Sequence, residues 1–425
     1  MARGGAAGRS GADGAGGGSA DRGDTRRVRL AIAVVVVATV VVGLALDATG
    51  TQLGVPHPPF IGAWGPRMDP LALIALPAFA AAALLCTRGT PAALFAGTLV
   101  LRVALAVARG GPERLDHAFA GGEGKNEYLP SLPAFEYGTR FVLDRFAQLV
   151  PSLPVHSAGH PPGLLLTMHV LGLDTAPKLA AFCIVAGAFS APLTYALAQR
   201  TIPAHARTAG ILAALSPALL HYGATSADAV YLTLGLLVAL GLLSRRPWLG
   251  ALAAAVASLF AWSLLAVPAW AALYVLKRDG LRPALKLAAL TGVTLVAFHA
   301  AFALATGFDP LGTLHATSRV YALGIASRRP YAYWLFGSPA AFLIIAGVPI
   351  AWLALQRLNT PEGAAIAAVI AASALLGFTK AETERIWLFL VPYLILAAAP
   401  QAKRPHLYAL AAQAVAYELL FDTLW

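Results

Sequence analysis

Leu30–Leu46, which reads LAIAVVVVATVVVGLAL, decides the fold class of this chain, because it carries no charged side chain and follows a basic flank of Arg26, Arg27 and Arg29. A helix that spans a bilayer needs about 20 predominantly apolar residues, whereas the apolar part of a secretory signal peptide has about 7 to 15. The run and its many apolar successors therefore predict an uncleaved first membrane helix. Positive charges favour the cytoplasmic side, so the flank places the N-terminus inside.

The composition extends this interpretation to the whole chain. Of 425 residues, 58% are hydrophobic and 12% are charged, and the mean hydropathy is +0.70. Because soluble proteins carry about 25% charged residues, we predict an integral membrane protein with many spans. Lys and Arg number 31 against 20 Asp and Glu, a formal charge of +11. Basic residues mark the cytoplasmic loops of membrane proteins, so nucleic acid is not an expected partner.

About thirteen segments have the length and hydropathy of membrane helices. They lie near residues 29–47, 70–87, 91–108, 177–198, 208–222, 229–244, 248–262, 264–276, 284–304, 333–355, 361–379, 386–400 and 405–424. Residues 1–28 are rich in Gly, Ala and Arg with almost nothing to bury, which predicts a disordered cytoplasmic tail. The predicted fold is all-α: a polytopic transmembrane helical bundle over residues 29–425, with residues 109–162 as an extracytoplasmic loop bearing juxtamembrane helices.

Alternate threading of these segments from an inside N-terminus tests the assignment, because short cytoplasmic loops collect Lys and Arg. Every predicted inner loop is basic; together they contain Arg88, Arg200, Arg207, Arg245, Arg246, Lys277, Arg278, Arg282, Lys286, Arg357, Lys403 and Arg404. The agreement requires that the apolar piece Leu164–Leu173 dips in or lies flat without crossing. The Gly-, Ala- and Arg-rich composition is typical of a GC-rich bacterium, so the predicted location is a bacterial plasma membrane.

The predicted outer loops collect acids, histidines and aromatic residues instead. The loop at residues 109–162 contains Asp116, Glu123, Glu127, Tyr128, His156 and His160; the loop at 305–333 contains Arg319, Arg328, Arg329 and Tyr331; the loop at 379–387 reads TKAETERIW and contains Lys380, Glu382, Glu384 and Arg385. Arginine and lysine on the outer side run against the positive-inside tendency. An anionic ligand at the outer membrane face would explain them.

The longest outer loop has a pattern of its own. In Phe135–Val150 (FEYGTRFVLDRFAQLV), apolar residues recur at three- and four-residue spacings, at Phe135, Val142, Phe146 and Val150. This pattern predicts an amphipathic helix along the outer headgroups. The segment Pro154–Gly163 (PVHSAGHPPG) follows. Because each proline fixes φ and removes a donor, its Pro-Pro pair is expected to stiffen the return to the membrane and to aim His156 and His160 at one pocket.

This order of features resembles the GT-C superfamily of membrane glycosyltransferases, which use polyprenyl-phosphate-linked sugars, and in layout the aminoarabinose and protein mannosyl transferases of that superfamily. Glu127-Tyr128 stands where those enzymes carry an acidic residue near a tyrosine in the first large extracytoplasmic loop. His160-Pro161-Pro162-Gly163 stands at their return to the membrane, and Ser216–Asp228 (SPALLHYGATSAD) is similar to their helix that ends in an acidic residue at the outer face.

The resemblance covers the helical body from about Arg102 to the C-terminus. The chain departs from the family in the two helices that precede the loop helix, and in the acid at the start of the loop, which is replaced by Glu127 or shifted to Asp116. The identity of the base is therefore open between these two residues.

Sugar transfer from a lipid phosphate needs residue types that these loops contain. A carboxylate must accept the proton of the attacking hydroxyl; Glu127 is the predicted base and Asp116 the reserve. Because arginine binds phosphate in bidentate geometry, the candidate phosphate ligands are Arg319, Arg328, Arg329, Lys380 and Arg385. The candidates for the sugar pocket are His156, His160, Asp228, Tyr331 and Trp334, and Tyr128 and Glu382 complete the predicted substrate site.

Plainer interpretations of the same residues stay open. Glu127 can be a solvated loop acid, and His160 can be a loop residue satisfied by the backbone. Glu382 and Arg385 lie three residues apart and can form an ordinary helical salt bridge. Arg328-Arg329 can anchor the loop to outer-leaflet headgroups.

The sequence supports no soluble cofactor. It contains no P-loop, DxD or HExxH motif, so ATP is not expected to drive the reaction; a divalent cation is left open. Cys86 and Cys183 lie in apolar runs and are predicted to be packing residues. Arg102, inside the third predicted span, is expected to face the bundle or to snorkel.

The expected activity is transfer of a mannose- or arabinose-like sugar from polyprenyl phosphate to a glycan, lipid or protein acceptor of the cell envelope. The alternative is a secondary transporter or lipid flippase. Such proteins usually show internal repeats and ionisable residues near the midplane. This sequence shows no clear repeat and few charges within its predicted spans.

Overall fold

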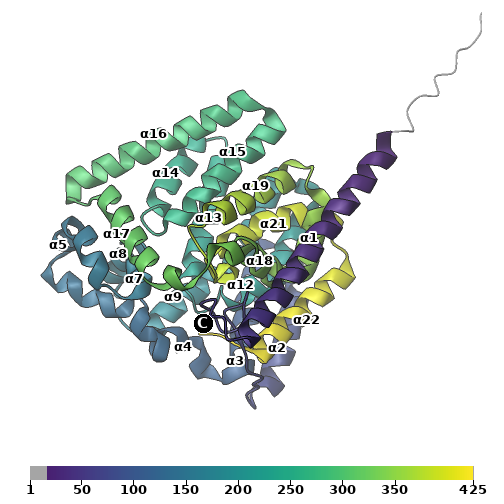
Figure 1. The fold of residues 1–425 in the computed structure, drawn as a ribbon, viewed down its shortest axis with the longest axis horizontal. Coiled ribbons are helices and arrows are strands. Elements are labelled where there is room, and N and C mark those ends of the chain that lie inside the picture. The colour runs from purple at the N-terminus through teal and green to yellow at the C-terminus, as the bar shows by residue number, and fades with distance from the viewer. Residues whose placement is uncertain (1–16, 425) are drawn as a thin grey trace, which may run out of the picture.

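Helices make up 79% of the computed structural model, which describes residues 17–424 (Figure 1). Two short strands, β1 (Ala63–Trp64) and β2 (Phe421–Asp422), pair antiparallel with Ala63 opposite Asp422. The prediction of an all-α chain is therefore confirmed.

Five segments among the described residues are long and apolar enough to cross a bilayer. They are Arg27–Ala48 within α1 (Gly17–Ala48), α3 (Pro91–Gly110), α9 (Ala176–Ala188) with α10 (Ser190–Thr201), α16 (Leu281–Thr306), and Tyr331–Arg357, which begins with α18 (Tyr331–Ala354). Shorter apolar helices accompany them: α2 (Ala72–Cys86), α13 (Asp228–Leu242), α14 (Pro247–Ala257), α19 (Pro361–Leu376) and α21 (Val391–Ala398). These helices indicate a multi-pass membrane protein, as predicted.

Some predicted segments are divided. The segment 208–222 contains α11 (Ala206–Leu215) and α12 (Pro217–His221), because Pro217 has no N–H with which to continue α11. The segment 386–400 follows α20 (Thr383–Ile386) and begins with a 3-10 turn before α21. The segments 264–276 and 405–424 contain α15 (Ala266–Asp279) and α22 (Arg404–Leu420).

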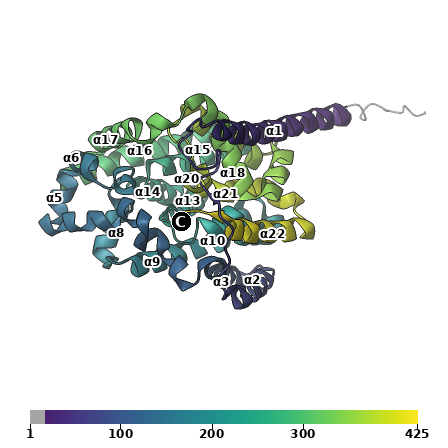
Figure 2. The same cartoon turned by 60° about the horizontal axis from the view of Figure 1, so that its bottom comes forward.

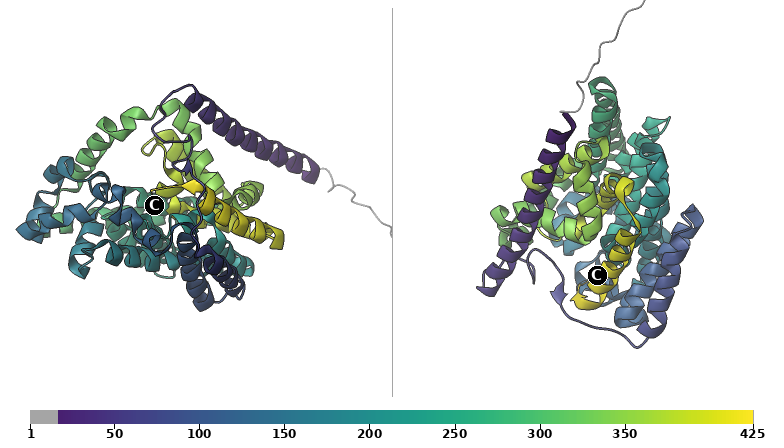
Figure 3. Two further views of the ribbon diagram at one scale, coloured as in Figure 1. Left: turned by 90° about the horizontal axis from the view of Figure 1, so that it is seen from below. Right: turned by 90° about the vertical axis from the view of Figure 1, so that its right-hand side faces the viewer.

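The predicted disordered tail at residues 1–28 lies mostly outside the described residues. The part outside is residues 1–16, and α1 begins at Gly17, twelve residues before the predicted span at 29–47. Once a helix has nucleated, each further residue adds one hydrogen bond, so the apolar run can extend its helix into the basic flank. The helix α1 lies against α18 at the edge of the bundle, and part of its length stands clear of the other helices (Figures 2 and 3).

The helix predicted over Phe135–Val150 is also corrected. The segment contains the end of η3 (Leu129–Tyr137), then α5 (Thr139–Asp144) and α6 (Phe146–Leu149). Gly138 interrupts it with φ of 96°, a left-handed conformation that a helix cannot include. The apolar stripe exists, since Val142 and Phe146 are buried, and α6 packs against α17 (Pro310–Leu323).

Hydrogen bonds join the loops that the charge pattern placed outside. Trp334 Nε1 donates to the carbonyl of Leu53 at 3.1 Å. The amide of Gly163, at the start of α8 (Gly163–Leu171), donates to the carbonyl of Leu259 at 2.7 Å. With nine residues, α8 is about 13.5 Å long, which is too short for a hydrocarbon core of about 30 Å.

The loops predicted to lie inside meet at the opposite end of the helices. Arg207 Nε donates to the carbonyl of Thr87 at 3.1 Å, and the guanidinium of Arg29 lies 5.7 Å from the centre of the Trp352 ring. The predicted inner loops and the predicted outer loops therefore lie at opposite ends of the helices. The acidic residues and the histidines gather at the end with the predicted outer loops.

Candidate functional site

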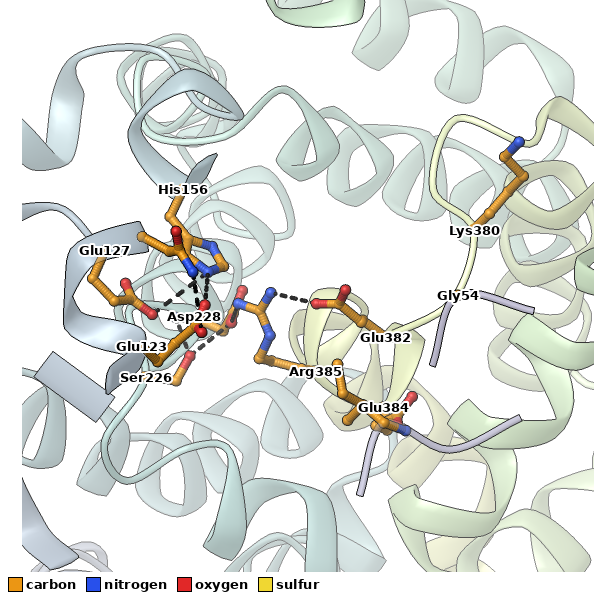
Figure 4. A network of polar contacts seen from close by, with 12 residues as sticks. Gly54, Glu123, Glu127, His156, Ser226, Asp228, Lys380, Glu382, Glu384 and Arg385 are labelled. Atoms are coloured by element: carbon orange, nitrogen blue, oxygen red, sulfur yellow. Dashed lines mark hydrogen bonds and ion pairs between the residues drawn. The ribbon is translucent and has the colours of Figure 1, made fainter. Parts of the chain in front are cut away.

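A buried polar cluster lies at the end of the bundle where the predicted outer loops meet (Figure 4). Four parts of the chain supply it: the long loop after α3, the junction of α12 and α13, the turn before α18 that carries Arg329, and the loop from α19 into α20. Its charged members are Glu123, Glu127, His156, Asp228, Arg329, Glu382 and Arg385. Since residues from 123 to 385 contribute, the fold and not a local motif creates this site.

One half of the cluster is a histidine between two carboxylates. His156, in α7 (Val155–Ala158), places Nε2 3.5 Å from Glu123 Oε1 and 3.7 Å from Glu127 Oε1. Burial disfavours a charged imidazole, but the carboxylates of Glu127 and Glu123 outweigh it and raise the pKa of His156. The contact with His156 in turn lowers the pKa of Glu123, against the effect of its partial burial. Glu127 itself is 2% exposed, so it is not a solvated loop acid.

The other half is a row of alternating charges. Arg385 Nη1 donates to Asp228 Oδ2 at 2.7 Å, and Nη2 donates to Glu382 Oε2 at 2.9 Å. Glu382 also accepts from Arg329 Nη2. Burial alone would raise the pKa of Glu382, but Arg385 and Arg329 lower it to about 2. The predicted pair Glu382/Arg385 is therefore a salt bridge, and it continues to Asp228 and Arg329.

The backbone beside Glu382 has an unusual conformation. Ala381 and Glu382 have φ of 64° and 56°, in the left-handed region that residues other than glycine seldom adopt. Such a residue costs of order 1–3 kcal/mol and persists where its surroundings hold it. Arg329 holds this turn from outside, because its Nη1 donates to the carbonyl of Lys380 at 2.7 Å. This strained turn aims the Glu382 carboxylate at Arg385.

Aromatic rings line the histidine half. The hydroxyls of Tyr128 and Tyr231 lie 2.8 Å apart. The Tyr128 ring centre is 6.3 Å from that of His156 and 6.2 Å from that of His160, and the His160 ring lies 5.0 Å from Tyr231. Both histidine rings thus lie near the Tyr128 ring. Burial lowers the pKa of His160 to about 4, so its ring is neutral at physiological pH.

The charges of the cluster do not cancel. Four carboxylates face two guanidinium groups and one imidazole. One net negative charge therefore remains even when His156 is protonated. A buried site of this kind attracts a cation or a group that becomes positive during a reaction.

Other predicted site residues lie outside the cluster. Asp116 is half-buried at the end of η1 (Pro112–Leu115), and Arg319 and Arg328 are exposed on α17 and η7 (Ile325–Arg328). Lys380 is directed away from the cluster, and its Nζ donates to Ala326 (Figure 4). Tyr331 is exposed and donates to Leu375, whereas Trp334 is buried against Leu53 and Ala381. The structure therefore gathers Glu127, Tyr128, His156, His160, Asp228, Arg329, Glu382 and Arg385, and leaves these six at its margin or away from it.

Three members of the cluster, and Glu384 beside it, had no role assigned from sequence. Glu123 reaches His156 because η2 (Gly122–Asn126) turns it toward the same ring as Glu127. Ser226 donates to Asp228 Oδ2 at 2.7 Å, and Tyr231 follows Asp228 by three residues on α13. Glu384 accepts from the amide of Ile61 at 2.7 Å, and burial raises its pKa to about 7. The spacing of residues in the sequence could have indicated two of them, because Ser226 lies two residues before Asp228 and Tyr231 lies one helical turn after it.

Comparison with known proteins adds no identity. No family model, curated protein or solved structure matches the chain. Within residues 17–424, no group of three or more His, Cys, Asp or Glu side chains is arranged to hold a metal ion. The chemistry of the cluster has to be argued from its own geometry.

The pH dependence of stability tests the histidine half. A pKa raised above the ordinary value of 6.5 means that His156 stabilises the fold fully below pH 6.5, and that this contribution is lost as pH rises through the folded-state value. We therefore expect the loss of melting temperature in His156→Gln to be larger at pH 6 than at pH 9. Thermal unfolding of the purified protein in detergent measures it. The exposed His315→Gln is the control, and an equal loss at both pH values would contradict the pairing.

Proposed function

We propose that this chain is a multi-pass membrane glycosyltransferase of GT-C-like layout, with about thirteen crossings, whose site faces the extracytoplasmic side. It transfers a mannose- or arabinose-like sugar from polyprenyl phosphate to an acceptor of the cell envelope. The observation that carries the proposal is Glu127: a buried acid in the first long loop, beside His156, in a cluster with one net negative charge. No soluble cofactor is needed for this reaction.

The chemistry of transfer matches this electrostatic environment. The acceptor hydroxyl oxygen attacks the anomeric carbon while Glu127 accepts the hydroxyl proton. The bond between that carbon and the phosphate oxygen breaks, and polyprenyl phosphate leaves with the electron pair. The sugar ring becomes positively charged in such transition states. A site that keeps one net negative charge stabilises that ring more than the uncharged donor sugar.

The departing phosphate needs cations that are not already paired with carboxylates. Arg329 and Arg385 are held by Glu382 and Asp228, so we assign them to fixing the carboxylates. The exposed Arg319 on α17 and Arg328 on η7 are the better phosphate ligands. They can reach a headgroup without breaking a buried ion pair.

The sidedness of the site gives a prediction that needs no substrate. Arg328 lies in a predicted outer loop and Arg245 in a predicted inner loop. We expect a membrane-impermeant maleimide to label Arg328→Cys in intact cells, and to label Arg245→Cys only after permeabilisation. The native Cys86 and Cys183 are free and buried, so their background is low. Equal labelling of both variants in intact cells would contradict the topology.

The activity itself is tested with purified protein, radiolabelled polyprenyl-phosphate mannose or arabinose, and a membrane extract that supplies acceptors. Label that moves into an acceptor fraction supports transfer. If the donor binds and no label moves with either sugar, another sugar has to be tried. If neither donor binds and proteoliposomes carry out counterflow of a labelled solute, the transporter hypothesis replaces the proposal.

A further inference from the structure

Residues 53–62 form a strap at the end of the bundle that holds the polar cluster. They belong to the connection between α1 and α2, part of which passes close to the cluster at Gly54 (Figure 4). The carbonyl of Gly54 lies 3.5 Å from Arg329 Nη2, and the amide of Ile61 donates to Glu384 Oε1 at 2.7 Å. The strap is therefore tied to the cluster through Arg329, and separately to Glu384.

Glu384 is buried more completely than it is hydrogen-bonded. The residue is 0% exposed, and its Oε2 has no hydrogen-bond partner within residues 17–424. Arg385, the next residue of α20, is directed to Asp228 and Glu382 instead. An ionised carboxylate in these surroundings lacks the hydrogen bonds and the paired charge that would replace its water.

The titratable groups that face Glu384 come from its own turn and from two further helices. On the turn, the charge of Arg385 lowers the pKa of Glu384, and the charge of Glu382 raises it. Tyr222, directly after α12, and Tyr417, on α22, also face it, and their hydroxyls lie 2.8 Å apart. Both phenols are neutral at physiological pH. Helix α18, which packs on α20, contains no charged residue.

Burial has the largest effect on the acidity of Glu384. It raises the pKa of Glu384 to about 7, although the amides of Ile61 and of Glu384 itself favour the ionised form. Water can reach an ionised Oε2 only if a neighbouring segment moves. The helices around it are held by their own backbone hydrogen bonds, whereas residues 53–62 belong to no helix or strand. The strap is therefore the segment that opens at the lowest cost in free energy.

We propose that Glu384 is a proton-dependent latch for the strap. With a proton on Oε2, the neutral carboxyl group accepts from the Ile61 amide and the strap stays closed; when the proton leaves to water, the strap opens and water solvates the carboxylate. Opening also withdraws the Gly54 carbonyl from Arg329, which holds the turn at Glu382. The latch thus couples pH to the geometry of the cluster. A proton needs no cavity, and this inference does not depend on sugar transfer.

Hydrogen exchange of the Ile61 amide measures opening, because opening breaks its bond to Glu384. Peptides that contain Ile61 are followed by mass spectrometry of the full chain in detergent, and each rate is divided by that of an unprotected amide at the same pH. A pKa of about 7 in the closed form, against the ordinary 4.5 in the open form, favours opening as pH rises between these values. We expect the protection of Ile61 to fall by about tenfold from pH 6 to pH 8.

Variants assign the effect to Glu384. Glu384→Gln keeps an oxygen that can accept from Ile61 but cannot ionise, so protection should agree at the two pH values within about twofold. Glu384→Met keeps the test valid if Glu384→Gln does not fold; its protection should be lower and equally independent of pH. His57→Gln removes the histidine of the strap itself, which lies partly exposed 3.7 Å from Asp47. This control should keep the fall between pH 6 and pH 8.

Equal protection of the wild-type Ile61 amide at pH 6 and pH 8 would overturn the latch. So would a fall that persists in both Glu384→Gln and Glu384→Met, or one that disappears in His57→Gln, since His57 would then be the sensor. Exchange is measured on protein without substrate. A chain that transfers no sugar can therefore still show the latch, and a chain without the latch can still transfer sugar.

Discussion

Glu127→Gln is expected to lower kcat for sugar transfer by about 10²- to 10⁴-fold, the usual contribution of a positioned general base. Glutamine keeps the shape of the side chain and can still accept a hydrogen bond from His156, but it cannot take a proton from the acceptor hydroxyl. Donor binding uses other residues, so KM for the donor should change little. Initial rates at saturating labelled donor measure the loss.

Two further carboxylates provide matched controls for that experiment. Glu123 touches the same imidazole as Glu127 but is more exposed, so Glu123→Gln should lower kcat by less than about tenfold if it only helps to hold His156. Asp116→Asn should have no effect, because Asp116 is half-buried outside the cluster. Wild-type kcat in Glu127→Gln, combined with a large loss in Asp116→Asn, would transfer the role of base to Asp116.

The apolar helices could be predicted from the sequence, because a segment that crosses lipid must be apolar along most of its length. Apolar runs such as Leu30–Leu46 are required for crossing, and basic loops mark one side. Contacts at Arg207 and at Trp334 place the loops in the same two groups as the charge pattern. The ends of the helices were harder to predict. Nothing in the apolar count shows that Gly138 turns to a positive φ and divides the helix expected over Phe135–Val150.

Some residues of the site could be predicted from the sequence, but the ion pairs between them could not. Acids and arginines in the predicted outer loops are rare charged residues in an apolar sequence. For this reason Glu127, Asp228 and Arg385 became candidates. Their distances are set by the packing of α12, α13 and α20. Arg385 and Asp228 are 157 positions apart in the chain, so no spacing rule connects them. This is why Arg385, predicted as a phosphate ligand, is found holding two carboxylates in the structure.

Arg385→Met is expected to lower the free energy of unfolding by about 3–5 kcal/mol, the usual effect of removing one partner of a buried ion pair. Methionine fills part of the volume of the arginine stem, but it leaves Asp228 with Ser226 alone and Glu382 with Arg329 alone. Unfolding of the purified protein in mixed micelles with increasing dodecyl sulfate measures the change. The exposed Arg140→Met, which removes a charge from α5, is expected to change stability by less than about 0.5 kcal/mol.

A second substitution distinguishes lost charge pairing from lost packing in this variant. Asp228→Asn in the Arg385→Met background removes the uncompensated charge and keeps an oxygen that can accept from Ser226. If the buried carboxylate is the main cost, the double variant should recover stability relative to Arg385→Met, although Asp228→Asn alone destabilises the protein. Such a sign change is the expected result for two residues that act as a unit. Additive losses would mean that Arg385 contributes through its contacts with the surrounding helices, and the row of alternating charges would then be a consequence of the fold and not one of its supports.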